Sequence, residues 1–213
     1  MEASSWESHY TAGKSALLYP DENLVRLLRK NPLLESPAGL TAVDLGCGSG
    51  RHLRLLADLG IPEAIGIDTS YNALVLSGKQ APGALIQGDN QRLPLKNECA
   101  DIVIAWGSLH YNNKYHFMGM LEEILRILKS GGYLFATLRS ERDTYLKRGK
   151  HLGNNVWITD LSDISGSTAS FYGEGELQVA FSIFSAHTYG LMERTLMGDI
   201  TSLISHWVIE ARK

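Results

Sequence analysis

Short apolar segments alternate with amphipathic segments along the first two thirds of the chain. The apolar segments are four to six residues long, and such a pattern predicts buried β-strands. The predicted strands cover residues 41–45, 64–67, 84–87, 101–105 and 133–138. Strands that alternate with helices join through right-handed parallel crossovers, which place helices on both faces of one sheet.

The amphipathic segments predict helices between these strands. The predicted helices cover residues 21–30, 51–59, 70–78, 115–129 and 174–181. The clearest pattern lies in residues 115–129, where Phe117, Leu121, Ile124 and Leu128 recur at helical spacing before a pair of glycines. These helices supply the outer layers of an α/β fold.

The last third of the chain follows a different pattern. Residues 139–170 are rich in charged residues, Gly, Ser and Thr, and we interpret them as a long variable insert. Residues 183–192 and 202–211 predict two strands with no helix between them. Such a pair fits an antiparallel ending on a mostly parallel sheet.

Composition narrows the class of protein. The chain has 213 residues, 44% of them hydrophobic, which suits one domain or one domain with a small lid. Its formal net charge of −3 argues against a general attraction to nucleic acid or to an anionic membrane. We therefore expect no nucleic-acid partner and no membrane partner, and the oligomeric state is left open.

Cysteines and histidines carry no metal pattern. The two cysteines lack metal-ligand spacing and form no disulfide framework, and the seven histidines show no i, i+4 pairing. We interpret both cysteines as reduced thiols and expect no metal site. The N-terminus lacks the apolar run of a signal peptide, and no stretch is apolar over the ~18 residues of a membrane helix. These features predict a cytoplasmic protein.

The stretch VDLGCGSGRH, residues 43–52, carries the first chemical signal. Glycines follow a strand and precede a helix, which is the context of a nucleotide-binding turn, although a plain tight turn has the same letters. The dinucleotide pattern G-x-G-x-x-G/A fails because Arg51 occupies the third small position. Asp44 would repel a pyrophosphate and suits an ammonium group. No Lys-Ser/Thr pair follows, so the turn is not a P-loop.

Three carboxylates occur at or after the ends of the first three predicted strands. They are Asp44, Asp68 and Asp89. Ligands of an open parallel sheet bind outside the carboxyl ends of its strands, so these acids can line one cleft. Asp44 suits a cationic amine, Asp68 suits two ribose hydroxyls, and Asp89 with Asn90 suits an exocyclic amine. An amino acid, a ribose and an adenine together make S-adenosylmethionine (SAM). Each aspartate alone also fits a cap or a turn.

As a set, four segments resemble the successive motifs of class I SAM-dependent methyltransferases of the small-molecule type, which have a minimal Rossmann-like core. The segments are VDLGCGSG, GIDTS, GDNQRLPLKNECADIVIAWGSLHY and LKSGGYLFATLRS, and the resemblance covers residues 40–140. A looser resemblance to the ends of a bacterial subgroup lies in WESHYTAGKSALLYPDENLVRLL and SHWVIEARK. Asn90 departs from the family, because many members have an apolar residue there.

The resemblance implies the fold and the domain organisation. The fold is an α/β Rossmann-like three-layer sandwich, whose mostly parallel seven-stranded sheet has an antiparallel last strand. Residues 1–213 form a single methyltransferase domain in this interpretation. Residues 1–32 are a helical N-terminal lid, residues 40–140 the cofactor-binding core, and residues 141–213 the variable insert with the terminal strands.

The resemblance also implies SAM as methyl donor and S-adenosylhomocysteine as product. The expected cofactor-binding residues are Asp44, Gly46, Cys47, Gly48, Gly50, Asp68, Thr69, Asp89, Asn90 and Trp106. Trp106, after the fourth strand, either covers the adenine or the sulfonium through a cation–π contact or belongs to the core.

Candidate residues for the acceptor lie at the same sheet edge and near the N-terminus. His110 is a candidate general base at near-neutral pH, and Tyr10 is the second catalytic candidate. The expected substrate-binding residues are Trp6, Tyr19, Tyr111 and Arg139. The N-terminal aromatic residues suit a lid, and Arg139 suits a carboxylate or phosphate of the acceptor. Core packing and a solvated loop are the alternatives for these positions.

These features predict a methyltransferase that moves the methyl group of SAM to an oxygen or nitrogen atom of a small-molecule acceptor. A SAM-binding module without catalysis, or an inactive partner subunit, is the alternative. Asp44 and Arg51 disfavour a nicotinamide oxidoreductase. A nucleic-acid methyltransferase would be expected to carry a basic face or a recognition domain, and neither is visible in the sequence.

Overall fold

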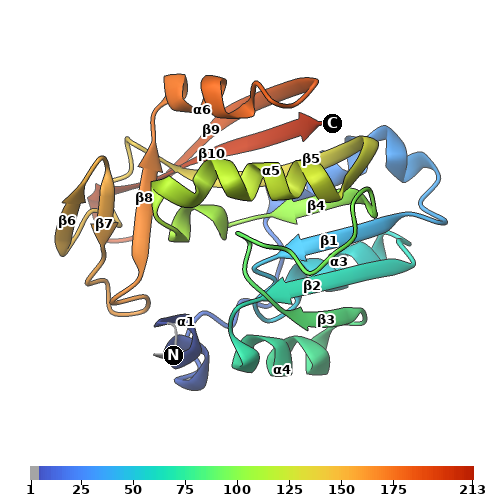
Figure 1. The fold of residues 1–213 in the computed structure, drawn as a ribbon. Helices are drawn as coiled ribbons and strands as arrows, with labels where there is room; N and C mark the ends of the chain where they lie inside the picture. The colour runs from blue at the N-terminus through green and yellow to red at the C-terminus, as the bar shows by residue number, and fades with distance from the viewer. Residues whose placement is uncertain (1–4) are drawn as a thin grey trace.

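Five parallel strands form the centre of a β-sheet in the computed structural model, which describes residues 5–213 (Figure 1). They are β1 (Thr41–Leu45), β2 (Glu63–Asp68), β3 (Ala84–Gln87), β4 (Ala100–Ala105) and β5 (Leu128–Ser140). Their spatial order is β3-β2-β1-β4-β5. Because the order reverses between β1 and β4, the loops after these strands diverge and leave room for a ligand at the carboxyl edge.

Two antiparallel strands extend the sheet beyond β5. Strand β10 (Asp199–Arg212) runs antiparallel to β5, and β9 (Ala186–Leu196) runs antiparallel to β10. The order β3-β2-β1-β4-β5-β10-β9 therefore has seven strands. The last strand of the chain, β10, runs antiparallel to β5, which belongs to the parallel set. The expected Rossmann-like α/β fold with an antiparallel last strand is confirmed.

The insert is more ordered than the sequence indicated. It holds three short strands, β6 (Lys150–Gly153), β7 (Val156–Ile158) and β8 (Thr168–Tyr172). They form an antiparallel set, and the end of β8 pairs in parallel with the end of β5. A separate apolar cluster under these strands includes Leu146 and Phe171. The strands are stabilised by this distant packing and pairing, which local composition does not report.

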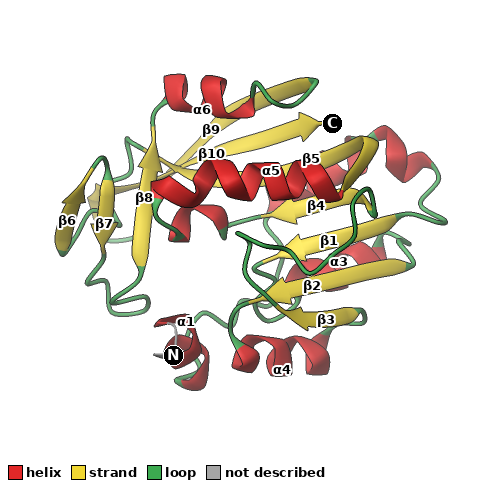
Figure 2. Ribbon diagram, in the orientation of Figure 1, coloured by secondary structure: helices red, strands yellow, loops and turns green. Residues whose placement is uncertain are grey.

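Six helices flank the sheet within the described residues. They are α1 (Ser5–Thr11), α2 (Glu22–Lys30), α3 (Arg51–Asp58), α4 (Tyr71–Gln80), α5 (Phe117–Ile127) and α6 (Glu174–Phe181). Figure 2 shows α5 in front of the sheet and α3 behind it. Two apolar cores follow from this layering: one packs α5 and α6 on the sheet, and the other packs α2, α3 and α4. Side-chain caps begin two of these helices, since Asp21 accepts from the Asn23 N–H and Ser70 accepts from the Ala73 N–H.

The N-terminal helix α1 bridges the insert and α4. Asn72 of α4 donates to Glu7 Oε1 at 2.6 Å and to Thr11 Oγ1 at 2.9 Å. On the opposite side, Ser5 Oγ lies 3.2 Å from Ser167 Oγ of the insert. The helix is thereby held across the carboxyl edge of the parallel strands. Within residues 5–213, no helix is both long and apolar enough to span a bilayer.

Candidate active site

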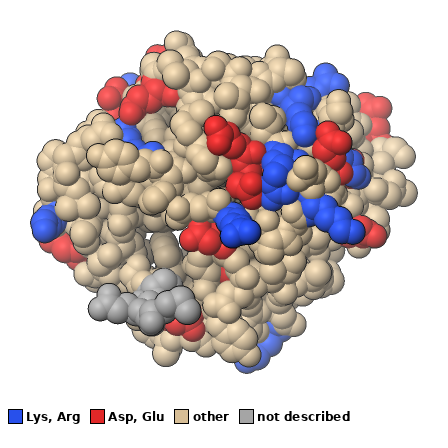
Figure 3. Space-filling view, viewed as in Figure 1, with Lys and Arg blue, Asp and Glu red and all other residues tan. Residues whose placement is uncertain are grey.

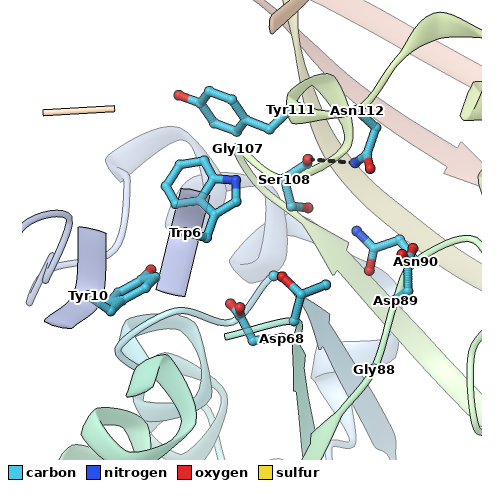
Figure 4. A pocket seen from close by; sticks show the side chains of 12 residues that line it. Trp6, Tyr10, Asp68, Gly88, Asp89, Asn90, Gly107, Ser108, Tyr111 and Asn112 are labelled. Carbon is cyan, nitrogen blue, oxygen red and sulfur yellow. Dashed lines mark hydrogen bonds between the residues drawn. The ribbon is translucent and has the colours of Figure 1, made fainter. Parts of the chain in front are cut away.

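A cavity of about 120 Å³ lies where the ends of β1, β2, β3 and β4 meet α1 (Figure 4). Its lining residues are Trp6, Tyr10, Gly46, Asp68, Thr69, Gly88, Asp89, Asn90, Gly107, Ser108, Tyr111 and Asn112. Figure 4 shows Asp89 and Asn90 on one side of this space, Trp6 and Tyr10 on the other, and Asp68 between them at the bottom of the view. We call it the strand-end cavity.

The glycine-rich turn after β1 is tied to the end of β2. The Gly46 and Cys47 N–H groups both donate to the Ile67 carbonyl, at 2.7 and 3.0 Å. Gly46 and Gly48 have φ angles of 68° and 54°, in the left-handed region that glycine adopts without strain. A Cβ on Gly48 would lie 2.5 Å from the Tyr10 hydroxyl. The turn therefore needs glycine both for its backbone and for the close approach of α1.

Asp68 connects the turn to the start of α4. Its Oδ2 accepts from the Gly48 N–H and its Oδ1 from the Ser70 N–H, both at 2.9 Å. Burial raises the pKa of the Asp68 carboxyl, and these backbone hydrogen bonds oppose that shift. Each carboxylate oxygen keeps further acceptor capacity, so Asp68 is fixed in place while still able to receive donors from a ligand.

Asp44 lies beneath the turn and does not line the strand-end cavity or the larger cavity that adjoins it. Its Oδ1 is 3.3 Å from His52 Nδ1, and its buried Oδ2 has no hydrogen-bond partner among the residues that the structure describes. Asp89 follows β3, where its Oδ1 accepts from the Gln91 N–H at 2.8 Å. The three carboxylates thus lie at or just beyond the ends of three adjacent strands, as the sequence predicts.

The strand-end cavity fits the chemistry of SAM. Its twelve lining residues include two carboxylates and no Lys or Arg. Such a surface suits hydroxyl and amine donors, and it would repel the phosphates of a dinucleotide. The unpartnered Oδ2 of Asp44 offers a further acceptor at the base of the turn. We find no cluster of metal-ligating side chains in residues 5–213.

A second and larger cavity, of about 580 Å³, adjoins the first. The two cavities share the lining residues Trp6, Tyr10, Gly46, Gly107 and Tyr111. We call the larger one the inner cavity, and residues of β5, β9 and β10 form part of its wall. The shared wall means that ligands in the two cavities would lie side by side.

The inner cavity contains two neutral histidines. The pKa of His110 falls to about 3, because the side chain is fully buried and Arg139 lies nearby. Burial and Arg139 also lower the pKa of His206. His110 Nδ1 lies 3.4 Å from the Thr137 carbonyl, which can only accept, so Nδ1 carries the proton and Nε2 is left with a lone pair. Burial likewise raises the pKa of the Tyr10 phenol, so Tyr10 is protonated at neutral pH.

Arg139 is held at the wall of the inner cavity by a buried ion pair. Its Nη1 donates to Asp143 Oδ2 at 2.6 Å, and its side chain is 8% exposed. Asp143 also accepts the backbone N–H groups of Leu146 and Ser205, both at 2.9 Å. These three donors hold the carboxylate in one position, and it holds Arg139 in turn.

The structure brings most of the predicted site residues to the two cavities. The smaller cavity gathers Trp6, Tyr10, Gly46, Asp68, Thr69, Asp89, Asn90 and Tyr111. The larger one adds Cys47, Gly48, Trp106, His110 and Arg139. Trp106 is 6% exposed, packs in the core beside α3 and lines the inner cavity, and its expected role at the cofactor stays a prediction.

Two predicted residues lie elsewhere besides Asp44. Tyr19 is 81% exposed and lines neither cavity, and only its backbone carbonyl, which accepts from Arg51, contacts the turn region. Gly50 is the left-handed N-cap of α3, and it adjoins Ser77 of α4 rather than a cavity. The substrate-binding role expected of Tyr19 is not supported, because its ring points to solvent.

Sequence reasoning missed residues that distant segments bring to the cavities. His206 lines the inner cavity from β10, and Arg194 lines it from β9. The pairing of β10 with β5 places His206 opposite Arg139. Ser108 and Asn112 of the strand-end cavity follow Trp106 in the motif after β4, a position from which they could have been inferred.

Comparison with known proteins identifies the core. Residues 43–136 match the sequence family described as a methyltransferase domain. A solved SAM-dependent methyltransferase from Methanosarcina mazei superposes with a TM-score of 0.69 at 18% identity, covering 86% of this chain and 97% of that one. Residues 43–136 therefore match a methyltransferase domain, the solved structure shows the same fold, and the expected resemblance, Rossmann-like fold and SAM cofactor are confirmed.

Two curated relatives correct the expected partner. The tRNA U34 carboxymethyltransferase of Marinobacter nauticus is 35% identical over 115 residues, which are 50% of this chain and 33% of the relative. The tRNA (carboxymethyluridine(34)-5-O)-methyltransferase of Arabidopsis thaliana is 30% identical over 117 residues, 53% of this chain and 28% of the relative. The chain thus spans about a third of the length of these relatives.

The expectation of a small-molecule acceptor and no nucleic-acid partner is wrong, because these relatives are tRNA-modifying enzymes. A net charge of −3 describes the chain as a whole, whereas a nucleic acid responds to the charges near its own binding surface. Figure 3 shows acidic and basic side chains intermixed on one face. Ion pairs also join acidic and basic side chains of this chain, such as Arg126 with Glu123 and Lys129 with Asp101. Net charge was therefore a poor guide to the partner.

Proposed function

Because the chain carries a methyltransferase domain, we propose that it transfers the methyl group of SAM to a nucleoside of tRNA. The observation that carries this proposal is the shared wall of the two cavities, which gives a donor and an acceptor adjoining places. SAM supplies a methyl group that its sulfonium already activates. The protein then contributes mainly position and exclusion of water.

The strand-end cavity is the proposed cofactor side. Asp68 suits the two ribose hydroxyls, because it is fixed by Gly48 and Ser70 and retains acceptor capacity. Asp89 and Asn90 line the same cavity on the side of β3, where an exocyclic amine of adenine fits. The glycine turn, with Asp44 below it, suits the amino-acid end. These roles agree with the absence of Lys and Arg from the twelve lining residues.

The acceptor is proposed to be a nucleophile that needs no deprotonation. His110 is unprotonated at neutral pH and, with a pKa of about 3, is a weak base. Tyr10 stays protonated, because burial raises the pKa of its phenol. Neither of the two catalytic candidates is therefore suited to remove a proton from the acceptor. A group that is already anionic or has a free lone pair meets this requirement.

Helix α1 is proposed to act as the lid over both cavities, as part of the N-terminal segment expected to have that role. Trp6 and Tyr10 come from this helix and line both cavities. Trp6 meets Tyr111 edge to face, with ring centroids 4.8 Å apart. Closing these contacts would shield the methyl group from water, and opening them would admit a nucleoside.

The choice of tRNA rests on the relatives, since both act on tRNA by name. The test is to incubate the protein with methyl-labelled SAM and total bacterial tRNA. We expect label in the RNA fraction that ribonuclease digestion renders acid-soluble. The variant Asp68→Ala is the matched control, because it is expected to bind SAM more weakly and so to transfer less label. SAM binding by calorimetry without label in tRNA would overturn the tRNA assignment and favour the non-catalytic SAM-binding module.

A further inference from the structure

A carboxylate and an imidazole face each other between the parallel sheet and α3. Asp44 of β1 and His52 in the first turn of α3 bring Oδ1 and Nδ1 to 3.3 Å, and both residues are buried. Ala42, which shares a face of β1 with Asp44, and Leu53, which follows His52, belong to the apolar core on this side of the sheet. A carboxylate in such a layer is costly unless donors surround it, so packing alone does not explain the pair.

The pair leaves two buried polar atoms without partners. His52 Nδ1 carries the proton, because the carboxylate oxygen that it faces can only accept. Within residues 5–213, neither Asp44 Oδ2 nor His52 Nε2 has a hydrogen-bond partner. In the same part of the chain, Asp44 forms no ion pair with a lysine or an arginine. A buried carboxylate with one free oxygen suits a ligand that brings positive charge together with N–H donors.

The charge of Asp44 reaches the strand-end cavity, although its side chain does not line that cavity. Burial is the main cause that raises the pKa of the Asp68 carboxyl, and the negative charge of Asp44 adds to this shift. Burial also raises the pKa of the Tyr10 phenol, and the charges of Asp68 and Asp44 contribute. Asp68 and Tyr10 both line the cavity. A cation bound beside the glycine turn is therefore attracted by two carboxylates.

His52 decides which oxygen of Asp44 is available to a ligand. The imidazole is held in place by its helix, because Leu53 and Leu56 of α3 are fully buried against the sheet. With Oδ1 engaged by the ring, Oδ2 is the oxygen that remains. His52 is the only hydrogen-bond partner of the Asp44 side chain within residues 5–213. Without the ring, the carboxylate would be free to rotate, since this terminal torsion is broad.

We infer that His52 is a positioning residue, which holds Asp44 so that its Oδ2 receives the ammonium of the amino-acid end of SAM. This inference deepens the cofactor side of the proposed function and rests on it. Asp44 binds the ligand, whereas His52 acts through Asp44 and does not touch the ligand. The pair serves the methyl donor alone, so its role is the same whatever acceptor the enzyme methylates.

The first experiment compares three ligands that differ at the amino-acid end. S-Adenosylhomocysteine has an ammonium and a carboxylate but no sulfonium, its decarboxylated analogue keeps only the ammonium, and 5′-methylthioadenosine has neither group. Each ligand is titrated by calorimetry into the wild-type protein and into His52→Leu. We expect His52→Leu to weaken both ammonium ligands about 10-fold, the lower end of what a charge-assisted hydrogen bond supports, and 5′-methylthioadenosine by less than about 2-fold.

The contrast between the ligands separates positioning from a merely structural role. A structural defect weakens all three ligands alike, so an equal loss for all three, or no loss for any, would overturn the inference. A loss confined to S-adenosylhomocysteine would assign the pair to the carboxylate and would overturn it as well. A wild-type protein that binds none of the three would reject the cofactor site together with the inference. Because no tRNA is present, failure of the tRNA assignment leaves these results unchanged.

Further variants test whether His52 acts through Asp44. His52→Asn keeps an N–H donor near the position of Nδ1 and should restore most of the affinity for the ammonium ligands. Asp44→Asn should lose at least as much of this affinity as His52→Leu, and the double variant Asp44→Asn/His52→Leu should lose no more than Asp44→Asn. Additive losses would overturn the inference. His116→Leu is the matched control, because His116 is exposed, and it should keep the wild-type affinities.

A measurement on the wild-type protein is independent of any folding defect in the variants. The ¹⁵N resonances of the His52 ring, assigned by their loss in His52→Asn, are followed during titration with the same three ligands. We expect Nδ1 to carry a proton throughout, and we expect both ammonium ligands to shift its resonance more than 5′-methylthioadenosine does. An equal response to all three ligands, or a ring protonated on Nε2 alone, would overturn the inference.

Discussion

The cofactor side and the acceptor side of this molecule are built in different ways. The cofactor side takes its residues from short motifs, each at the end of its own strand, as with Asp68 at the end of β2 and Asp89 two residues beyond β3. The acceptor side joins Trp6 near the N-terminus, Arg139 near the end of β5 and His206 near the C-terminus. Residues close together in the sequence form the cofactor side, whereas strand pairing and long-range packing bring the residues of the acceptor side together. Substitutions should therefore affect cofactor affinity on one side and folding together with acceptor choice on the other.

The largest effect is expected from Asp143→Ala on the acceptor side. It removes the partner of a buried guanidinium together with the acceptor for two backbone N–H groups. Breaking a buried pair by removing one partner costs about 3–5 kcal/mol of the free energy of unfolding. Denaturant unfolding measures this loss, and Asp160→Ala at an exposed position is the control. A loss below about 1 kcal/mol, the value of a surface pair, would contradict the structural role of Asp143.

Asp68→Ala should act on the cofactor side with a smaller effect. The substitution removes charge-assisted hydrogen bonds to the ligand, worth about 1.5–3 kcal/mol of SAM binding free energy. Calorimetric titration with SAM gives the change directly. Because Asp68 also holds the turn through Gly48, the unfolding transition is recorded for the same variant. Unchanged SAM affinity in a folded variant would remove Asp68 from the cofactor site.

The pH dependence of stability should reveal the neutral histidines of the acceptor side. The pKa of His110 is about 3 in the folded protein and 6.5 as its reference value, so the unfolded chain binds a proton that the native state refuses. Stability is then complete above about pH 6.5 and falls toward pH 3, by up to about 1.4 kcal/mol per pH unit. Across this range, the free energy of unfolding should change less steeply with pH in His110→Gln than in His116→Gln, which alters an exposed histidine. Equal slopes would contradict the burial of a neutral imidazole.

Tyr19→Ala should have the smallest effect of these changes. The Tyr19 ring is 81% exposed and lines neither cavity, so its loss should change stability and SAM affinity by less than about 0.5 kcal/mol. The comparison with Tyr10→Ala is informative, because Tyr10 lines both cavities. A strong loss of acceptor binding in Tyr19→Ala alone would show that the acceptor extends beyond the inner cavity.

The same division explains what could be predicted from the sequence. The cofactor side was predictable because a strand end, a turn and a carboxylate lie within a few residues of each other. Arg139 was predictable for a similar reason, since it directly follows the fifth predicted strand. Tyr19 was assigned to the site from its aromatic character alone, which does not distinguish a ring at a cavity from one in solvent.

The rest depends on pairing that the local pattern does not report. His206 faces the inner cavity only because β10 pairs with β5 in the register that sets it opposite Arg139. A shift of one residue would turn its side chain to the other face of the sheet. The short strands β6, β7 and β8 similarly depend on one another and on the small core that contains Phe171. Periodicity finds elements, but it leaves open which of them become neighbours.

Analysis of the nucleosides of treated tRNA tests the central claim most directly. Total bacterial tRNA is incubated with the protein and SAM, digested to nucleosides and compared by mass spectrometry with tRNA incubated without the protein. Our account predicts that one nucleoside gains a single methyl group that is absent from the tRNA incubated without the protein. An unchanged nucleoside profile with SAM bound would contradict the proposed activity on tRNA.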